Sequence, residues 1–398
     1  MKVLVVNAGS SSIKYQVVDM TNESVLAVGL VDRVGIPGTT LEHKPMGKDK
    51  VLIKKDLPDH TTGMKMVLEV LVNEEYGCVK SMDEIGAVGH RVVHGGEEFS
   101  ESVVIDDRVK KVIKDCFDIA PLHNPPNMMG IEACQELMPN VKHVAVFDTA
   151  FHQTMEAANF LYALPYEVYE KYRVRRYGFH GTSHFYVSHR AAELMGKPFE
   201  ECKIITLHLG NGASMAAIKN GKVIDITMGF TPLEGLVMGT RSGDIDPAIV
   251  FFLMDKLGLS TSEANNYFNK KSGMLGLSGV SNDLRDIIEA ANSGNNRAQI
   301  ALEVYFNRVK GYIGNYIAKL NGCDCLVFTA GVGENAIETR ENICQELDYL
   351  GIKMDTNKNN VRGKEVEVSA EDSKVKIFVI PTNEELVIAR DTFRLAQS

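Results

Sequence analysis

The feature that most constrains this chain is a format that recurs along it: an apolar run, a short turn of small polar residues, and a second run. The first copy spans residues 3–15, and its turn, NAGSSS, spans 7–12. Consecutive apolar residues suit a strand buried on both faces, while glycine and serine let backbone amides and hydroxyls approach an anion closely. A second copy spans 204–215, and a looser one spans 326–335. The repetition predicts a duplicated domain that clasps one nucleotide.

Composition narrows the class of protein. The chain has 398 residues, 44% of them hydrophobic, which is long enough for about two or three domains with a full core. Its net charge of −9, with dispersed basic residues, argues against nucleic acid as a partner. Among seven cysteines only Cys323 and Cys325 form a close pair, without histidines at zinc spacing, which predicts reduced thiols. No apolar stretch approaches the roughly 20 residues of a membrane span, and the run after Lys2 is too short for a signal peptide. We therefore expect a cytoplasmic protein that does not bind membranes.

Strand-like runs alternate with helical patterns in the first part of the chain, which is typical of an α/β fold. These runs are residues 3–6, 13–18, 87–93 and 143–147. A domain boundary is expected near residue 150, and a second α/β series begins at about residue 204. Residues 296–320 predict one long helix that ends at Asn321 and Gly322. A short last helix over 385–395 could fold back across either half.

Three kinds of phosphate-binding motif can be compared with the sequence. The chain has no Gly-x-x-x-x-Gly-Lys-Ser/Thr stretch, so a P-loop is not expected. Residues 331–336 match the dinucleotide fingerprint only superficially, because Glu334 would place a carboxylate beside a pyrophosphate. The 7–12 turn could be an ordinary hairpin turn, since Asn, Gly and Ser dominate such turns. The similar turn at 210–212, together with the positive charge of Lys14, favours a phosphate site instead.

Two arginines lie where an anion could bind. Arg91 ends an apolar run in GHRVVHGG, and Arg241 lies in the glycine-flanked stretch GTRSGDIDP. A guanidinium at such a position can hold a carboxylate or phosphate through a bidentate fork. For Arg91 the alternative is a buried salt bridge, and near Arg241 the residues Asp244 or Asp246 could be only helix caps. The pair could together clamp an anionic transition state.

A histidine and an aspartate are candidates for the chemistry. His180 and His184 have H-x-x-x-H spacing, but the glutamate of a metalloprotease is missing and a glycine stands between them. His180, in a loop before a helix, is better placed to donate a hydrogen bond to developing charge, the alternative being a buried histidine without that role. Asp148 follows an apolar run, at the kind of strand end where α/β proteins bind ligands. It could also be a turn cap.

The region before the last helix suggests a metal site. A strand is expected at 375–380, followed by PTNEE at 381–385. Thr382 and Glu385 have capping-box spacing, which leaves Glu384 unexplained. A free carboxylate beside phosphate turns suggests Mg²⁺, which prefers oxygen ligands, and the amide oxygen of Asn7 could complete the pair directly or through water.

Taken together and in order, these stretches closely resemble the acetate kinase family, which belongs to the superfamily of sugar kinases, heat-shock chaperone ATPases and actin. The match spans nearly the whole chain, with one small departure at Glu156, where proline is expected. The motifs are NAGSSS at 7–12, GHRVVHGG at 89–96, APLHNPPN at 120–127, FDTAFHQTM at 147–155, RRYGFHGTSH at 175–184, HLGNGAS at 208–214, GFTPLEGLVMGTRSGDIDP at 229–247, SGVSNDLRD at 278–286, AGVGEN at 330–335 and PTNEE at 381–385.

The resemblance implies an α/β fold with two duplicated actin-like (ribonuclease H-like) domains and an active-site cleft between them. Domain I would comprise residues 1–150 plus 386–398, and domain II, which binds the nucleotide, residues 151–385. The implied reaction is the reversible, in-line transfer of the ATP γ-phosphate to acetate, giving acetyl phosphate and ADP. It would require Mg²⁺, with Mn²⁺ as a possible substitute, and the enzyme would be a homodimer.

The resemblance also assigns roles to residues. Asp148 would be an acid/base residue, while His180 and Arg241 would stabilise the transition state. Arg91 would hold the acetate carboxylate, and Lys14 would meet the phosphates. The metal would bind Asn7 and Glu384. The acetate methyl group would lie among Val93, Leu122, Phe179 and Pro232, and the nucleotide would bind His208, Leu209, Gly210, Asn211, Gly212, Asp283, Leu284, Arg285, Gly331, Val332, Gly333, Glu334 and Asn335.

Elementary chemistry agrees with an acyl kinase. Acetate is ionised at pH 7, so positioning and charge neutralisation should supply most of the catalysis. A kinase for propionate or another short-chain fatty acid is the nearest alternative, because one methylene changes binding by only about 1 to 3 kcal/mol. An ATPase that works as a binding module would lack the paired anion sites at Arg91 and Arg241. A nicotinamide oxidoreductase would leave the serine turn and its echo without a purpose.

Overall fold

In a computed structural model that describes residues 1–398, both predicted polar turns join antiparallel strands. The first turn connects β1 (Lys2–Ala8) to β2 (Ser12–Asp19), and the second connects β9 (Lys203–Leu209) to β10 (Ala213–Lys219). A backbone hydrogen bond closes each turn: Gly9 N donates to Ser12 O at 2.7 Å, and Gly210 N donates to Gly212 O at 3.1 Å. The third, looser copy differs, because β12 (Cys325–Thr329) runs directly into helix α12 (Ala330–Asn335).

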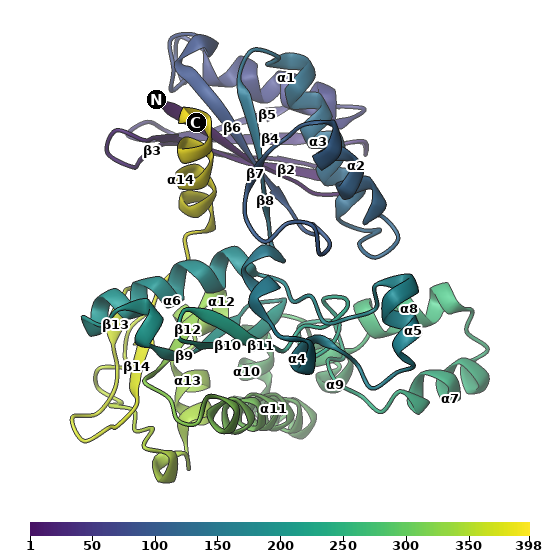
Figure 1. Ribbon diagram of the computed structural model, residues 1–398, viewed down its shortest axis with the longest axis vertical. Helices are drawn as coiled ribbons and strands as arrows, with labels where there is room; N and C mark the ends of the chain where they lie inside the picture. The colour runs from purple at the N-terminus through teal and green to yellow at the C-terminus, as the bar shows by residue number, and fades with distance from the viewer. The chain divides into compact units, whose positions relative to one another are not determined.

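The chain forms two units, coloured from purple to yellow along the sequence in Figure 1. Unit 1 comprises Met1–Gln153 and Asn383–Ser398, and unit 2 comprises Thr154–Thr382. The first boundary, after Gln153, lies close to the expected residue 150, whereas the second boundary differs at residues of the predicted site. Asn383, Glu384 and Glu385 belong to unit 1, whereas the expected boundary assigns them to the second domain.

Unit 1 is built on an eight-stranded sheet of order β5-β4-β3-β2-β1-β6-β8-β7. Strands β1, β6 and β8 are parallel, and the rest pair antiparallel. The strands not yet given are β3 (Ser24–Asp32), β4 (Thr40–Pro45), β5 (Val51–Lys54), β6 (Ile85–Val92), β7 (Val103–Val104) and β8 (Lys142–Phe147). The helices are α1 (His60–Leu71), α2 (Asp107–Asp115), α3 (Asn124–Leu137) and α14 (Glu384–Gln397).

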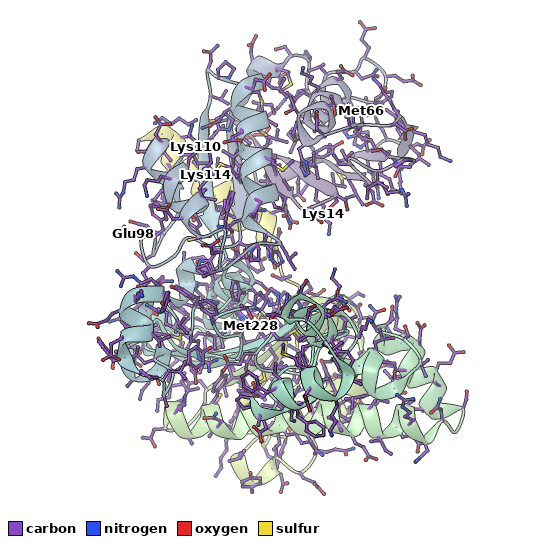
Figure 2. All side chains as sticks on the ribbon, turned by 90° about the vertical axis from the view of Figure 1, so that its right-hand side faces the viewer. Lys14, Met66, Glu98, Lys110, Lys114 and Met228 are labelled. Atoms are coloured by element: carbon purple, nitrogen blue, oxygen red, sulfur yellow. The ribbon has the colours of Figure 1, made fainter.

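The two faces of this sheet are covered by different parts of the chain. Leu4 and Val6 of β1 belong to the buried cluster that includes the apolar faces of α1 and α3. Val3 and Val5 instead pack with Ile388 of α14, which contacts β1, β6 and β8. Successive residues of a strand point to opposite faces, so a continuous apolar run is what a doubly covered strand requires. Figure 1 shows α14 lying across the sheet. In Figure 2, the labelled residues Lys110 and Lys114 mark helix α2 of the same unit.

Unit 2 repeats this topology in a six-stranded sheet of order β11-β10-β9-β12-β14-β13. Its centre again joins an antiparallel hairpin to two parallel neighbours, β12 and β14. The remaining strands are β11 (Lys222–Ile226), β13 (Val366–Glu367) and β14 (Lys376–Val379). The helices are α4 (Ala157–Phe160), α5 (Tyr166–Tyr172), α6 (Gly181–Met195), α7 (Ala248–Leu257), α8 (Thr261–Lys270), α9 (Gly273–Ser278), α10 (Leu284–Asn292), α11 (Asn296–Leu320), α12, and α13 (Ile337–Cys344). The shared strand order confirms the predicted duplication of an actin-like α/β domain.

Local predictions are mostly confirmed. The long helix α11 spans the predicted residues, with Asn295 capping its start and Asn321 ending it in the left-handed conformation. The start of α14 corrects a prediction. Its cap is Asn383, whose side chain accepts a hydrogen bond from Leu386 N, so Thr382 and Glu385 do not form a capping box. No helix in the structure combines the length and the apolar character needed to cross a bilayer.

Candidate functional site

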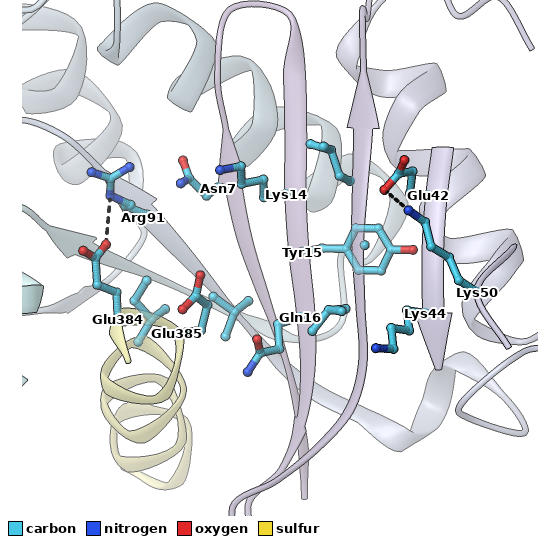
Figure 3. A pocket seen from close by; sticks show the side chains of 15 residues that line it. Asn7, Lys14, Tyr15, Gln16, Glu42, Lys44, Lys50, Arg91, Glu384 and Glu385 are labelled. Atoms are coloured by element: carbon cyan, nitrogen blue, oxygen red, sulfur yellow. Dashed lines mark ion pairs between the residues drawn. The ribbon is translucent and has the colours of Figure 1, made fainter. Parts of the chain in front are cut away.

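A cavity of about 350 Å³ lies in unit 1, on the sheet face beside the N-terminus of α14. Figure 3 shows its lining, with Asn7 and Lys14 next to each other and Arg91 opposite Glu384. Asn7 and Lys14 are register partners across the β1–β2 hairpin, which places both beside the turn. Arg91 comes from the end of β6, and Glu384 is the first residue of α14. The fold thus brings Arg91 to the same cavity as Lys14 and the predicted metal pair, Asn7 and Glu384.

Arg91 is held by a buried carboxylate. Its Nε donates to Asp148 Oδ1 at 2.9 Å and its Nη2 donates to Asp148 Oδ2 at 2.6 Å. Asp148 directly follows β8, which pairs in parallel with β6, so the two strand ends place the pair side by side. Burial alone lowers the pKa of Arg91, but Asp148 and Glu384 outweigh it and raise the pKa above the ordinary value. Arg91 is therefore a fixed cation with three N–H groups left for a ligand.

Glu384 is the second carboxylate near this cation. Its Oε2 lies 4.0 Å from Arg91 Nε, and 21% of its side chain is exposed. Burial raises the pKa of Glu384 to about 7, against the opposing effect of Arg91. Asn7 offers an amide oxygen to the same cavity. The chain has no cluster of three or more His, Cys, Asp or Glu side chains that could hold a metal, so any metal here would have few protein ligands.

In unit 2, His180 precedes α6 as its N-cap, in the left-handed conformation with φ of 56°. Its Nδ1 lies 2.8 Å from Ser214 Oγ, and its ring stacks on His208 at 4.1 Å between centroids. His184 does not form a metal pair with His180, because its two ring nitrogens bind the hydroxyls of Thr206 and Ser214.

Arg241 approaches His180 from a glycine-rich loop. A Cβ on Gly212 would lie 3.5 Å from Arg241 Nη1 and 3.6 Å from His180 Nε2, so both groups border the space over this glycine. Arg241 Nη1 donates to Pro232 O at 3.2 Å. Burial lowers the pKa of Arg241, although an arginine remains charged at any physiological pH. Unit 2 therefore carries a cation and an imidazole directed at one place.

A larger cavity of about 620 Å³ opens beside the second polar turn. Eight of the predicted nucleotide residues line it: Gly210, Asn211, Asp283, Leu284, Arg285, Gly331, Val332 and Asn335. Asp283 caps α10 and pairs with Arg285, whose hydrogen bonds lower the pKa of Asp283 to about 2. Arg285 is 88% exposed. The cavity combines backbone turns, a helix start and one ion pair, which suits a nucleotide.

The other predicted nucleotide residues do not line this cavity. Lys14 lies in unit 1, in the cavity described first. His208 stacks on His180, and Leu209 is fully buried, so only its backbone can face a ligand. Glu334 Oε1 accepts from Thr382 N at 3.1 Å. The remaining two are Gly212, beside Arg241, and Gly333, whose carbonyl accepts from Arg340.

The predicted acetate pocket is divided between the units. In unit 1 Val93 is buried directly after β6, with its N–H bound to Asn127 Oδ1 at 3.0 Å, whereas Leu122 is 58% exposed. In unit 2 Phe179 is buried directly before His180, and the carbonyl of Pro232 binds Arg241. Phe179 and Pro232 therefore adjoin His180 and Arg241, and Val93 follows Arg91 by two residues.

Several polar side chains that support the site were not predicted individually. They are Ser183, which bonds His208 Nδ1 and Thr382 Oγ1, and Ser214, Thr206, Asn127 and Asn282. Four of them, Ser183, Asn127, Ser214 and Asn282, lie inside motifs that carry the family resemblance, and only Thr206 lies outside them. Position in a motif was the available signal, but a hydroxyl's partners depend on which strands become neighbours.

Two copies of one sheet topology, each with a polar hairpin turn, define an actin-like α/β protein. The model of the acetokinase family matches residues 2–390. An acetate kinase of Syntrophomonas wolfei subsp. wolfei is 86% identical over 397 residues and covers 100% of both chains. A crystal structure of Porphyromonas gingivalis acetate kinase has a TM-score of 0.96 at 51% identity, covering 99% of each chain. A propionate kinase from Francisella tularensis subsp. tularensis has a TM-score of 0.93 at 42% identity, also covering 99% of each chain.

The chain belongs to the acetokinase family, whose members are kinases that transfer phosphate to a carboxylate.

Proposed function

We propose that the protein is an acetate kinase, which reversibly transfers the γ-phosphate of ATP to acetate. An acetate oxygen forms a bond to the γ-phosphorus while the bond to the β-phosphate oxygen breaks, and acetyl phosphate and ADP result. No proton needs to move in either direction, since the acid reacts as its anion. The observation that carries the proposal is Arg91, a cation fixed by Asp148 with donors left for a carboxylate.

The residues of each unit would take distinct parts. Arg91 would hold the acetate carboxylate through its remaining N–H groups, and Asp148 would orient that guanidinium. Arg241 and His180 Nε2 would stabilise the transferring phosphoryl group, because positioning and electrostatic stabilisation dominate this chemistry. The nucleotide would occupy the 620 Å³ cavity of unit 2. The methyl group would lie among Val93, Leu122, Phe179 and Pro232, as the family resemblance implies.

The residues present fit a magnesium ion. Mg²⁺ binds proteins through one or two carboxylates together with substrate phosphates, and Glu384 and Asn7 offer a carboxylate and an amide oxygen to one cavity. A divalent cation would also favour the ionised form of Glu384, whose pKa burial raises to about 7. The ion would neutralise phosphate charge, and Mn²⁺ has the same ligand preference. Lys14 would add a second cation at the phosphates.

A propionate kinase is the second candidate. The observation that favours it is the similarity to a propionate kinase at a TM-score of 0.93. Propionate adds one methylene, which a pocket discriminates by about 1 to 3 kcal/mol. We expect activity with both acids and a higher kcat/KM for acetate.

One experiment tests the function. The protein is incubated with ATP, Mg²⁺ and acetate, propionate, butyrate or no acid, and any acyl phosphate is trapped with hydroxylamine. We expect trapped product with acetate, none without acid, and loss of product in Arg91→Ala. Arg108→Ala is the matched control, because Arg108 is an exposed arginine of unit 1 that pairs only with Glu98 in an ion pair. ATP hydrolysis that proceeds equally without a carboxylic acid, and that gives no trapped product, would contradict the proposal.

The proposal includes a homodimer in the cytoplasm. Helix α7 has no buried residue, and Ile249, Phe251 and Phe252 are 40%, 72% and 59% exposed. Such an apolar face is typical of a protein interface. We expect light scattering to give twice the mass of the 43.9 kDa chain, and Phe251→Asp to shift it toward the monomer. A wild-type protein that is monomeric at micromolar concentration contradicts this part.

A further inference from the structure

Four side chains of unit 2 form a continuous hydrogen-bonded chain that ends at His180. Thr206 Oγ1 lies 2.7 Å from His184 Nδ1, and His184 Nε2 lies 2.7 Å from Ser214 Oγ. Ser214 Oγ lies 2.8 Å from His180 Nδ1. Ser214, His184 and Thr206 are all fully buried. The chain is therefore shielded from water, so its members must satisfy one another.

The fold explains why one serine meets two histidines. His180 is the N-cap of α6 and His184 lies in its first turn, where His184 N donates to His180 O at 3.0 Å, so the start of this helix holds the two residues close together. Ser214 on β10 pairs with His208 on β9, and α6 packs against β9. Thr206 lies two residues before His208 on the same strand and so faces the same side. The start of a helix and two strands thus converge on the Ser214 hydroxyl.

His180 needs such an anchor. As a non-glycine residue with φ of 56°, it holds a backbone conformation that costs about 1 to 2 kcal/mol. Stacking on His208, with 20° between ring planes, fixes the plane of the imidazole. Stacking alone does not decide which edge of the ring points outward. The bond from Nδ1 to Ser214 decides it, and leaves Nε2 at the space over Gly212 beside Arg241.

The serine hydroxyl also controls where the protons lie. It carries one proton, so it donates to one histidine and accepts from the other. If Thr206 donates to His184 Nδ1, then His184 Nε2 donates to Ser214, and Ser214 donates to His180 Nδ1. Neutral His180 then bears its proton on Nε2, facing Arg241. The titratable or charged groups around the ring are His184 on α6, His208 on β9 and Arg241 on its loop.

We propose that Ser214 is a positioning residue, whose buried hydroxyl orients His180 so that Nε2–H faces the transferring phosphoryl group beside Arg241. The inference rests on the proposed role of His180 in the kinase reaction. Ser214 touches no substrate in this account. It acts by selecting the ring orientation and the tautomer of the histidine that does.

The test compares Ser214→Ala with Ser188→Ala. Ser188 is a fully buried serine on α6 whose hydroxyl donates only to Phe185 O, at 3.1 Å. We expect Ser214→Ala to lower kcat at least tenfold, with the KM for ATP within twofold of wild type. Ser188→Ala should keep both within twofold. A kcat within twofold of wild type in Ser214→Ala overturns the inference.

A second measurement does not depend on activity. In protein labelled with ¹⁵N-histidine, the ring nitrogens of His180, assigned from His180→Gln, report the tautomer directly. We expect a protonated Nε2 and an unprotonated Nδ1 at pH 8 in wild type, and a mixture of tautomers in Ser214→Ala. Identical nitrogen signals in both proteins overturn the inference. If wild type forms no acyl phosphate, the proposed function fails while these spectra still decide the role of Ser214.

Discussion

Replacing Asp148 by asparagine separates two accounts of this residue, orientation of Arg91 and transfer of a proton. The substituted side chain has nearly the same shape and still offers one oxygen to Arg91. Its amide nitrogen would face Arg91 Nη2, where Asp148 Oδ2 now accepts a hydrogen bond at 2.6 Å. The change therefore removes one of two charged hydrogen bonds and leaves the site otherwise intact.

The expected size of the effect follows from this contact. A hydrogen bond to a charged group contributes about 1.5 to 3 kcal/mol. Asp148 is 2% exposed, but 22% of the Arg91 side chain is exposed, so water partly replaces the lost partner. We therefore expect a loss of about 2 kcal/mol in the binding and orientation of the acid, which is roughly 30-fold in kcat/KM for acetate at about 1.36 kcal/mol per tenfold change. A general acid or base would contribute about 10² to 10⁴.

The assay is hydroxylamine trapping at varied acetate and saturating ATP, repeated from pH 6 to pH 9. The KM for ATP should stay within twofold, because Arg91 and the nucleotide cavity belong to different units. Asp391→Asn is the control, since Asp391 is a half-buried aspartate of unit 1 that accepts a hydrogen bond from Ser102 and pairs with Arg394. A loss above 10³-fold in kcat, together with disappearance of one limb of the pH profile, would refute orientation and support proton transfer.

Three further predictions concern stability, nucleotide binding and catalysis. Burial keeps the pKa of both His90 and His143 below the unfolded value of about 6.5. The free energy of unfolding, measured in urea titrations, should therefore decrease as the pH is lowered from 6.5, by up to about 1.4 kcal/mol per pH unit for each histidine. Gly239→Ala should weaken ATP binding at least tenfold by calorimetry, because its Cβ would lie 1.9 Å from Asn211 Oδ1. Arg241→Ala should lower kcat by about 10³ to 10⁵, with little change in ATP affinity.

The first two of these predictions have a matched variant, and the third has an outcome that would contradict it. His90→Gln should show a shallower pH dependence than wild type, and parallel curves would contradict the role of the histidine pair. Gly311→Ala should bind ATP normally, since nothing lies within 4 Å of a Cβ at that position. Equal losses of kcat and ATP affinity in Arg241→Ala would count against its action on the transition state.

Much of the fold could be predicted because its signals are local. Apolar runs long enough to be buried on both faces identified β1, β6 and β8, and a periodic pattern identified α11. The strands β3, β4 and β5 were missed. In β4 polar residues interrupt the apolar ones, and the apolar run of β5 is short, whereas β3 has a long apolar run at 25–31 to which no strand was assigned.

The site was predicted as residues rather than as an arrangement. Arg91 and Asp148 were each identified at a strand end, but their bidentate pair follows from the parallel register of β6 and β8. Glu384 was noticed because no cap explained it, and Asn383 proved to be the cap. The hydroxyls around His180 were missed, since serine has no sequence pattern that reveals which histidine it will meet.

The sequence by itself determined the family, the duplicated strand-turn-strand format and the residue types that can bind anions. These properties depend on short-range order along the chain. Only the tertiary structure decided that α14 returns to the first sheet and brings Glu384 to Arg91, and that Ser214 joins His180 to His184. The physical reason is that burial and strand register act between residues far apart in the sequence. They set which charges face each other and which protons can be shared.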